Sequence, residues 1–146
     1  MSKNTLLNIY VASTLLVSGL GIALMACWLL YPYEPFTFYS EHNQTLQEAY
    51  YPGDTVQWRS HFKHNTTGKL VQVDRQLIDG IVINYATTNY VSDGQEKDFI
   101  NASMRLPDFI SPGKYHIEIV NTVRVNPLRD VIVVRRTNDF VILPKP

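Results

Sequence analysis

The chain has 146 residues, a formal net charge of +0 at pH 7 and one cysteine, Cys27. This length allows one globular domain once a hydrophobic N-terminal segment is set aside. The neutral charge gives no electrostatic reason to expect nucleic acid or a strongly acidic partner. Because the only thiol lies inside the hydrophobic segment, the sequence excludes an intramolecular disulfide framework for the domain.

The N-terminal part of the sequence is dominated by apolar residues. Residues 1–4 form a short tail, and no charged residue occurs between Lys3 and Glu34. Because a helix rises about 1.5 Å per residue, about 20 apolar residues span the ~30 Å hydrocarbon core of a bilayer. The sequence therefore predicts one transmembrane helix over residues 5–31, with membrane lipid as its partner.

A proline-containing linker is predicted over residues 32–35, because proline cannot continue a helix. The basic residue Lys3 precedes the apolar segment, whereas the acidic residues Glu34 and Glu41 follow it. This asymmetry favours an N-terminus on the inner side of the membrane. We therefore expect a location in the inner membrane with the domain on the outer, periplasmic or extracellular, side, or a location in a virion.

Two alternatives to an intact spanning helix remain open at this point. A cleaved signal peptide has a hydrophobic region of only about 7–15 residues, which is shorter than the apolar segment of this chain. The run Leu24-Met25-Ala26-Cys27 resembles the lipobox of bacterial lipoproteins, in which the cysteine is lipidated and becomes the new N-terminus. Trp28, Leu29 and Leu30 continue the apolar run, where lipoproteins usually turn polar.

Small side chains recur at every fourth position of the predicted helix, at Gly19, Ala23 and Cys27. In lipid, such a face lets two helices approach closely. The alternative is ordinary membrane-helix composition. The pattern leaves open a homo-oligomer that forms through this face.

Residues 36–146 are predicted to form an all-β domain, because apolar and polar residues alternate with period two and no amphipathic helix occurs. Seven or eight short strands favour an Ig-like antiparallel β-sandwich, with an up-and-down barrel as the alternative. The strands are expected near residues 36–39, 56–62, 71–77, 81–85, 99–106, 115–125 and 130–143, the last with an interruption at 137–139.

The alternation also predicts which side chains form the core and where the chain turns. Trp58 is the first candidate for the core centre, and the other predicted core residues are Phe62, Tyr115, Ile117 and Ile119. Asp79-Gly80 is expected to be a hairpin turn. The polar stretch Thr87–Lys97 is expected to be the longest loop.

Several short motifs in the domain occur in a recognisable order. They are Pro52-Gly53-Asp54, Asp74-Arg75 through Asp79-Gly80, Pro112-Gly113-Lys114-Tyr115, Val125-Asn126-Pro127-Leu128-Arg129 and Thr137 to Phe140. In this order, which covers most of residues 52–142, the chain resembles small, N-terminally membrane-anchored Ig-like proteins of tailed bacteriophages. The resemblance implies a phage setting and a sandwich domain, but no settled activity. Such relatives often carry cysteines near the positions of Phe62 and Gln95, and this chain has neither.

The sequence contains no recognisable motif for catalysis or for metal binding. His61 and His64 would point to opposite faces of a strand, which argues against a shared metal ion. Neither a Gly-x-Ser-x-Gly nucleophile elbow nor a glycine-rich phosphate loop occurs. We therefore expect a protein without cofactor, metal or enzymatic activity.

Charged side chains near the C-terminus and in the polar stretch are the candidates for partner binding. The alternative for the basic residues is that they protect an exposed strand from edge-to-edge pairing. Pro127 is expected to fix a turn, and Arg129 to contact carbonyl groups nearby. The candidate partner-binding residues are Arg124, Arg129, Arg135, Arg136, Asp93 and Glu96.

These observations favour a non-enzymatic, membrane-anchored binding or assembly module of a phage, either a virion component or an envelope-associated protein. It would bind membrane lipid through its helix and an unidentified protein partner through its domain, and no nucleic acid. The first alternative is a lipoprotein lipidated at Cys27 that acts in surface exclusion of other phages. A hydrolase of envelope polymers is a weaker alternative, because the sequence singles out no nucleophile or acid for it.

Overall fold

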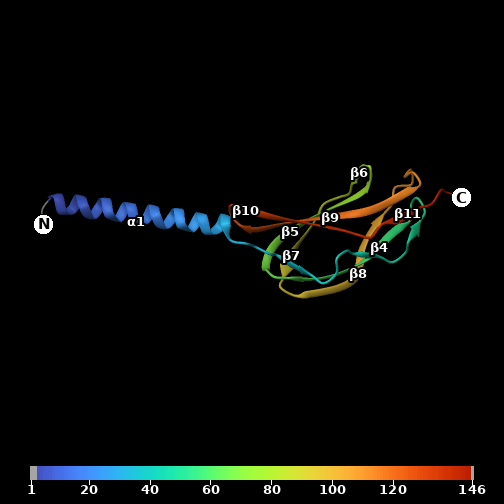
Figure 1. Ribbon diagram of the computed structural model, residues 1–146, viewed down its shortest axis with the longest axis horizontal. Helices are drawn as coiled ribbons and strands as arrows, with labels where there is room; N and C mark the ends of the chain where they lie inside the picture. Colours follow the sequence, from blue (N-terminus) through green and yellow to red (C-terminus); the bar gives the residue numbers. More distant parts are fainter. Residues whose placement is uncertain (1–2, 146) are drawn as a thin grey trace. The chain divides into compact units, whose positions relative to one another are not determined.

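The computed structural model describes residues 3–145, with the side chains of residues 99–102 left aside. It divides into two compact units, of which the first is Met1–Tyr33 with Asn126–Arg129 and the second is Glu34–Val125 with Asp130–Pro146. Most of the first unit is a single helix, and nearly all of the strands lie in the second (Figure 1). The predicted class, an N-terminal apolar helix followed by an all-β domain, is confirmed at this level.

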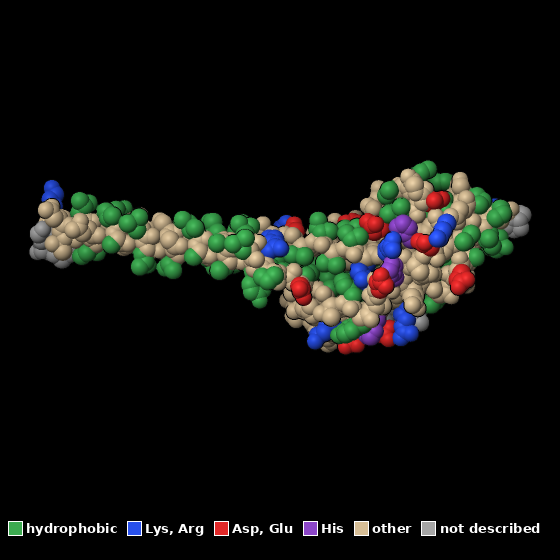
Figure 2. All heavy atoms as spheres, viewed as in Figure 1, with side chains coloured by type: hydrophobic (Ala, Val, Ile, Leu, Met, Phe, Trp, Pro, Cys, Tyr) green, Lys and Arg blue, Asp and Glu red, His purple; other side chains and the backbone are tan. Residues whose placement is uncertain are grey.

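Helix α1 is Lys3–Leu30, a run of 28 residues, none of which is buried. It is long and apolar enough to cross a membrane. Apolar side chains follow one another along its visible length (Figure 2). The helix begins two residues earlier than the predicted start and ends one residue before the predicted end, Tyr31. The small residues Gly19, Ala23 and Cys27 lie within α1, and association through them stays a prediction.

The C-terminal end of α1 is held by polar side chains of the turn Asn126–Arg129. The last carbonyl groups of a helix have no partner inside the helix and need hydrogen-bond donors from outside it. The Asn126 side-chain amide donates to the Trp28 carbonyl at 2.8 Å. The Arg129 guanidinium donates to the carbonyls of Leu29 and Tyr31, each at 2.8 Å. Arg129 therefore contacts carbonyl groups as the sequence predicts, and these carbonyls belong to the helix end.

The smaller sheet of the second unit is built around one long strand, β4. Strand β8 pairs with β4 along one edge, and two short strands, β1 and β2, pair with its other edge. All pairs in this four-stranded sheet are antiparallel. The bounds are β1 Phe36–Phe38, β2 Gln44–Thr45, β4 Thr55–His64 and β8 Glu96–Arg105.

The larger sheet has seven strands and is built around β5 and β9, which pair antiparallel. The outer edge of β5 carries β6 and β7, and the outer edge of β9 carries β10 and β11. Strand β3 runs parallel to β11. The bounds are β3 Ala49–Tyr50, β5 Thr67–Asp79, β6 Ile81–Asn84, β7 Thr88–Asp93, β9 Gly113–Asn126, β10 Arg129–Arg136 and β11 Phe140–Ile142.

The two sheets turn their buried faces toward a common interior (Figure 1). Alternate residues of β4 and β9 point inward, as the period-two pattern requires. Trp58, with only 1% of its surface exposed, is buried together with Tyr115, Ile117 and Ile119, whereas Phe62 is half-buried. Neither sheet closes on itself among the described residues, which gives the barrel alternative no support.

One prediction about the strands was wrong. The polar stretch Thr87–Lys97 is not a long loop, because it contains all of β7 and the start of β8. Only a tight turn at Gly94, with φ of +72°, separates the two strands. The final predicted strand is interrupted at residues 137–139, as expected, and gives β10 and β11.

Candidate functional site

A partly open cavity of about 160 Å³ lies in the second unit, between the two sheets. Its lining comes from β1, β4, β5, β7, β9 and β10, so both sheets contribute to it. The apolar lining residues are Phe36, Phe38, Trp58, Phe62, Val73 and Ile119. The polar lining residues are Asn43, Ser60, Arg75, Tyr90, Asn121 and Arg135.

Two arginines at inward-facing positions line the cavity. The guanidinium carbon of Arg135 lies 4.4 Å from the centroid of the Phe38 ring, and this side chain also donates to the carbonyl of Ser40. Arg75 donates to the Thr88 hydroxyl at 3.0 Å. Burial lowers the pKa of both guanidinium groups from the ordinary value. Among the described residues, no carboxylate lies within ion-pair distance of either.

Two residues of the lining each carry a buried donor that lacks an acceptor. The indole Nε1 of Trp58 and the Nε of Arg135 are buried and have no hydrogen-bond partner among the described residues. By contrast, the buried pair of Asn43 and Ser60 is satisfied internally, since the Ser60 hydroxyl lies 3.2 Å from the Asn43 amide oxygen. Unsatisfied buried donors are rare in proteins, and each is a place where water or a ligand group would bind.

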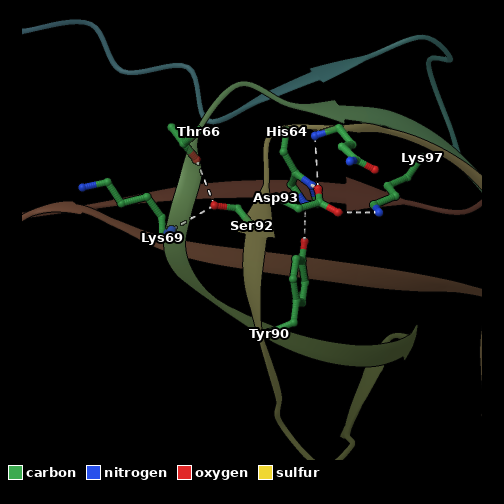
Figure 3. A network of polar contacts seen from close by, with 8 residues as sticks. His64, Thr66, Lys69, Tyr90, Ser92, Asp93 and Lys97 are labelled. Atoms are coloured by element: carbon green, nitrogen blue, oxygen red, sulfur yellow. Dashed lines mark hydrogen bonds and ion pairs between the residues drawn. The ribbon is translucent and has the colours of Figure 1, made fainter.

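A chain of polar contacts runs from the cavity wall to the surface (Figure 3). His64 ends β4 with only 3% of its surface exposed. Its Nε2 lies 3.0 Å from the Tyr90 hydroxyl, and its Nδ1 lies 3.0 Å from the Asp93 carboxylate. The other Asp93 oxygen lies 2.5 Å from the Lys97 ammonium.

The donor and acceptor roles of Asp93, His64 and Tyr90 in this series of contacts follow from the charge of Asp93 and from the pKa values of Asp93 and Tyr90. The hydrogen bond from Lys97 is the main reason that the pKa of Asp93 lies far below its usual range, followed by the backbone N–H of Gln95 and by His64. An ionised Asp93 can only accept, so the Nδ1–H of His64 donates to it. Burial, with the Asp93 charge, raises the pKa of Tyr90 to about 12, against the opposing charge of Arg75.

This arrangement superficially resembles a catalytic triad, with an acid, a histidine and a hydroxyl in line. A triad nucleophile must be activated toward deprotonation, however. The raised pKa of Tyr90 is the opposite of activation. The His64 chain therefore joins β4 to β7 and β8, and positions the Tyr90 hydroxyl at the cavity wall.

The predicted partner-binding arginines do not form one patch. Arg124 is paired with Asp130, with 3.0 Å between Nε and Oδ1, and Arg136 donates to His42 Nε2 at 3.0 Å. Arg129 contacts the end of α1, and Arg135 enters the cavity. Neighbouring residues of β10 point to opposite faces, which separates Arg135 from Arg136.

The two predicted acidic residues, Asp93 and Glu96, also form hydrogen bonds with other side chains of the same protein. Asp93 belongs to the His64 chain, as described above. Glu96 lies 2.7 Å from His61 Nε2 and accepts from the Tyr39 hydroxyl at 3.4 Å. The His61 contact is the main reason that the pKa of Glu96 is lowered. Among the described residues, no group of three or more His, Cys, Asp or Glu side chains is placed to hold a metal ion.

Among the residues that sequence reasoning missed at this site are His64, Arg75 and Tyr90. One signal was present, because Arg75 alternates with the buried residues Val73 and Leu77 and must therefore point inward. Tyr90 and His64 gave no comparable signal, because their contact depends on how β7 and β4 come together. Such contacts between distant segments are not encoded in local periodicity.

Comparisons with known proteins show only distant similarity in structure. No protein-family model matches the sequence, and no curated protein matches it either. The sporulation control protein Spo0M of Bacillus subtilis is similar over 77% of this chain and 51% of its own, with 15% identity and a TM-score of 0.44. The alkylpurine DNA glycosylase AlkC of Pseudomonas fluorescens, solved bound to DNA with an abasic site analogue, is similar over 84% of this chain and 33% of its own. Its identity is 12% and its TM-score is 0.44.

Proposed function

We propose that this chain is a non-enzymatic binding or assembly module anchored in a membrane by one intact helix. The observation that carries the proposal is the composition and exposure of α1. None of its 28 residues is buried, and none after Lys3 is charged. An isolated apolar helix of this length is unfavourable in water, because it exposes apolar surface that neither the helix nor a partner buries. A bilayer provides the missing apolar environment.

The domain that follows is proposed to be an Ig-like sandwich of a phage protein. It lies outside the inner membrane or in the virion. Two open sheets, antiparallel except for the pair of β3 and β11, have a shared interior, and this supports the sandwich. Domains of this kind act mainly through loops and strand edges, which are free to contact other molecules.

Strand β10 is the candidate surface for a protein partner. Among the named strands of the described part of the chain, β10 pairs with β9 alone. The apolar run Val131–Val134 forms its middle, and Ile132 and Val134 expose 64% and 52% of their surface. An open edge with exposed apolar side chains can accept an extended segment of a partner as an additional strand. The proposed partner is therefore a protein with such a segment.

Site-specific photo-crosslinking in membranes tests this part of the proposal. A photoreactive amino acid at Ile132 is expected to give a discrete cross-linked product in the native host. The matched control carries the same group at Ile81, which is also exposed but lies in β6 on the far side of the sheet. No product at position 132, or the same products at both positions, would count against β10 as the binding edge.

A protease-accessibility experiment tests the location of the domain. In intact cells, added protease is expected to leave the chain undigested. After the outer membrane is opened, protease should remove the domain and leave a fragment of the size of α1. Protection of the domain until the inner membrane is lysed would overturn the proposed orientation.

A further inference from the structure

The cavity between the sheets has features that a merely imperfect core would lack. A packing defect is lined by apolar groups, and its polar neighbours are satisfied by one another. Here two lining residues, Trp58 and Arg135, each carry a buried donor, Nε1 and Nε, that has no hydrogen-bond partner among the described residues. Arg75 lines the same cavity as Arg135, so two guanidinium groups contribute to the polar part of the lining.

All formally charged side chains in the lining of the cavity are positive. Arg75 and Arg135 carry the formal positive charges, and the lining contains no aspartate or glutamate. Burial lowers the pKa of both guanidinium groups, against the opposing charge of Glu41 on Arg135, as expected for guanidinium groups partly removed from water. Burying a charge without a partner is costly, and an anion that enters the cavity removes that cost. Arginine is suited to this role, because its fork of donors matches a carboxylate.

The remaining lining is apolar and aromatic, with the rings of Phe36, Phe38 and Phe62 on the side of the smaller sheet. The volume of about 160 Å³ limits what fits. For comparison, an apolar cavity of about 150 Å³ accommodates one benzene ring. The cavity is therefore too small for a lipid chain or a nucleotide, and it suits a body the size of one ring.

We propose that this cavity is a binding site for a small monocarboxylate whose apolar body is about the size of one aromatic ring. The carboxylate pairs with the guanidinium groups of Arg75 and Arg135, and the apolar body packs against the phenylalanine rings of the lining. This site is separate from the outer edge of β10 and does not depend on the proposed protein partner.

Benzoate is the probe that tests the proposal, with benzyl alcohol as its neutral counterpart of similar size. The full chain is placed in nanodiscs of phosphatidylcholine and carries Trp28→Phe, so that Trp58 is its only tryptophan. Benzoate is expected to change Trp58 fluorescence in a saturable manner at neutral pH. Benzyl alcohol should bind about tenfold more weakly or less, because it lacks the charge that the arginines recognise.

Charge-removing substitutions provide the matched comparison. Arg135→Gln and Arg75→Gln should each weaken benzoate binding about tenfold, the loss expected for a charge-assisted hydrogen bond. Arg136→Gln removes the same charge from the next residue of β10, which faces away from the cavity, and should leave binding unchanged.

Three results would overturn the proposal. The first is the absence of saturable binding by a parent protein whose circular dichroism shows the β domain to be folded. The second is equal binding of benzoate and benzyl alcohol, which would reduce the site to an apolar void and needs no variant to fold. The third is an equal effect of Arg136→Gln and Arg135→Gln, which would indicate unspecific attraction to surface charge.

Discussion

At the scale of single residues, Trp58 is the side chain whose removal is expected to destabilise the domain most. It lies in the middle of β4, has 1% of its surface exposed and is the largest of the fully buried side chains. Trp58→Ala is expected to lower the free energy of unfolding by about 3–5 kcal/mol, the range for emptying a large aromatic site in a packed core. Urea unfolding followed by circular dichroism measures this loss.

The control for Trp58 is Val134→Ala on the exposed face of β10, where a change of no more than about 0.5 kcal/mol is expected. A loss below about 1 kcal/mol for Trp58→Ala would show that the inward face of β4 contributes far less than its burial indicates.

The His64 chain predicts a dependence of stability on pH. The pKa of Asp93 in the folded protein lies below the unfolded value, which is roughly 3.9. Its contribution to stability is therefore complete above the unfolded pKa and is lost as the pH falls through the folded one. Asp93→Asn should lower the urea midpoint at pH 7, and the gap to the parent should close progressively below about pH 4.

The control for Asp93 is Glu118→Gln, which removes a carboxylate that makes no ion pair with the described residues. Its midpoint should follow that of the parent at each pH. If the Asp93→Asn gap at pH 7 persisted unchanged at pH 2–3, the ion pair with Lys97 and the contact with His64 would not be its source.

Residues of the site differ in how far the sequence alone reveals them. Arg135 was singled out for its charge, but its inward direction and its contact with Phe38 follow only from the position of β10 in the sheet. Trp58 was predictable, because alternation within one strand decides which way it points. Asp93 was predicted to bind a partner, yet in the structure its partners are His64 and Lys97 of the same chain.

At the scale of elements, the end of α1 is fixed by its contacts with the turn Asn126–Arg129. Arg129 brings a positive charge to a helix C-terminus, where it is favourable by about 0.3–1 kcal/mol. Arg129→Ala should therefore increase amide hydrogen exchange in the last turn of α1 about two- to fivefold. The rest of the helix should exchange at its former rate.

The control for the helix end is Arg136→Ala, in which an equally charged side chain of β10 contacts His42 and not the helix. Equal exchange in the last turn of the two variants would mean that the Arg129 contacts do not hold the helix end.

Strand β7 shows why the polar stretch was mistaken for a loop. Its inward residues are Thr88, Tyr90 and Ser92, so an apolar pattern is missing although the strand pairs with β5. Polar side chains can face inward here because they bond to one another and to the backbone, as Ser92 does with the N–H of Lys69. A pattern based on hydrophobicity cannot detect a strand of this kind.

At the scale of the whole molecule, the division into two units predicts that the β domain folds without the helix. Nearly all of its sheet pairing and its buried core lie within the second unit. Residues 35–146 are therefore expected to form a soluble, β-rich monomer without detergent. Circular dichroism and light scattering check this, and a predominantly helical spectrum or an aggregate would contradict it.

The overall architecture was predictable where a long, repeated pattern determined it. The unbroken apolar run predicts α1, and the alternation from Tyr115 to Val125 predicts β9 within a few residues. The assignment of strands to two sheets was not predictable, because it depends on which strands meet. The same holds for the cavity, whose lining comes from six strands and from residue Asn43 between β1 and β2.

The central claim is that an intact helix anchors the domain in a membrane, and intact mass measured on carbonate-washed membranes tests it most directly. The parent and Cys27→Ser should both stay in the membrane fraction at full-length mass, since a spanning helix needs apolar surface and not the sulfur. Loss of about the first 26 residues in the parent, with an added acyl mass that Cys27→Ser abolishes, would contradict the claim and establish a lipoprotein. A parent chain found in the carbonate supernatant would contradict membrane anchoring altogether.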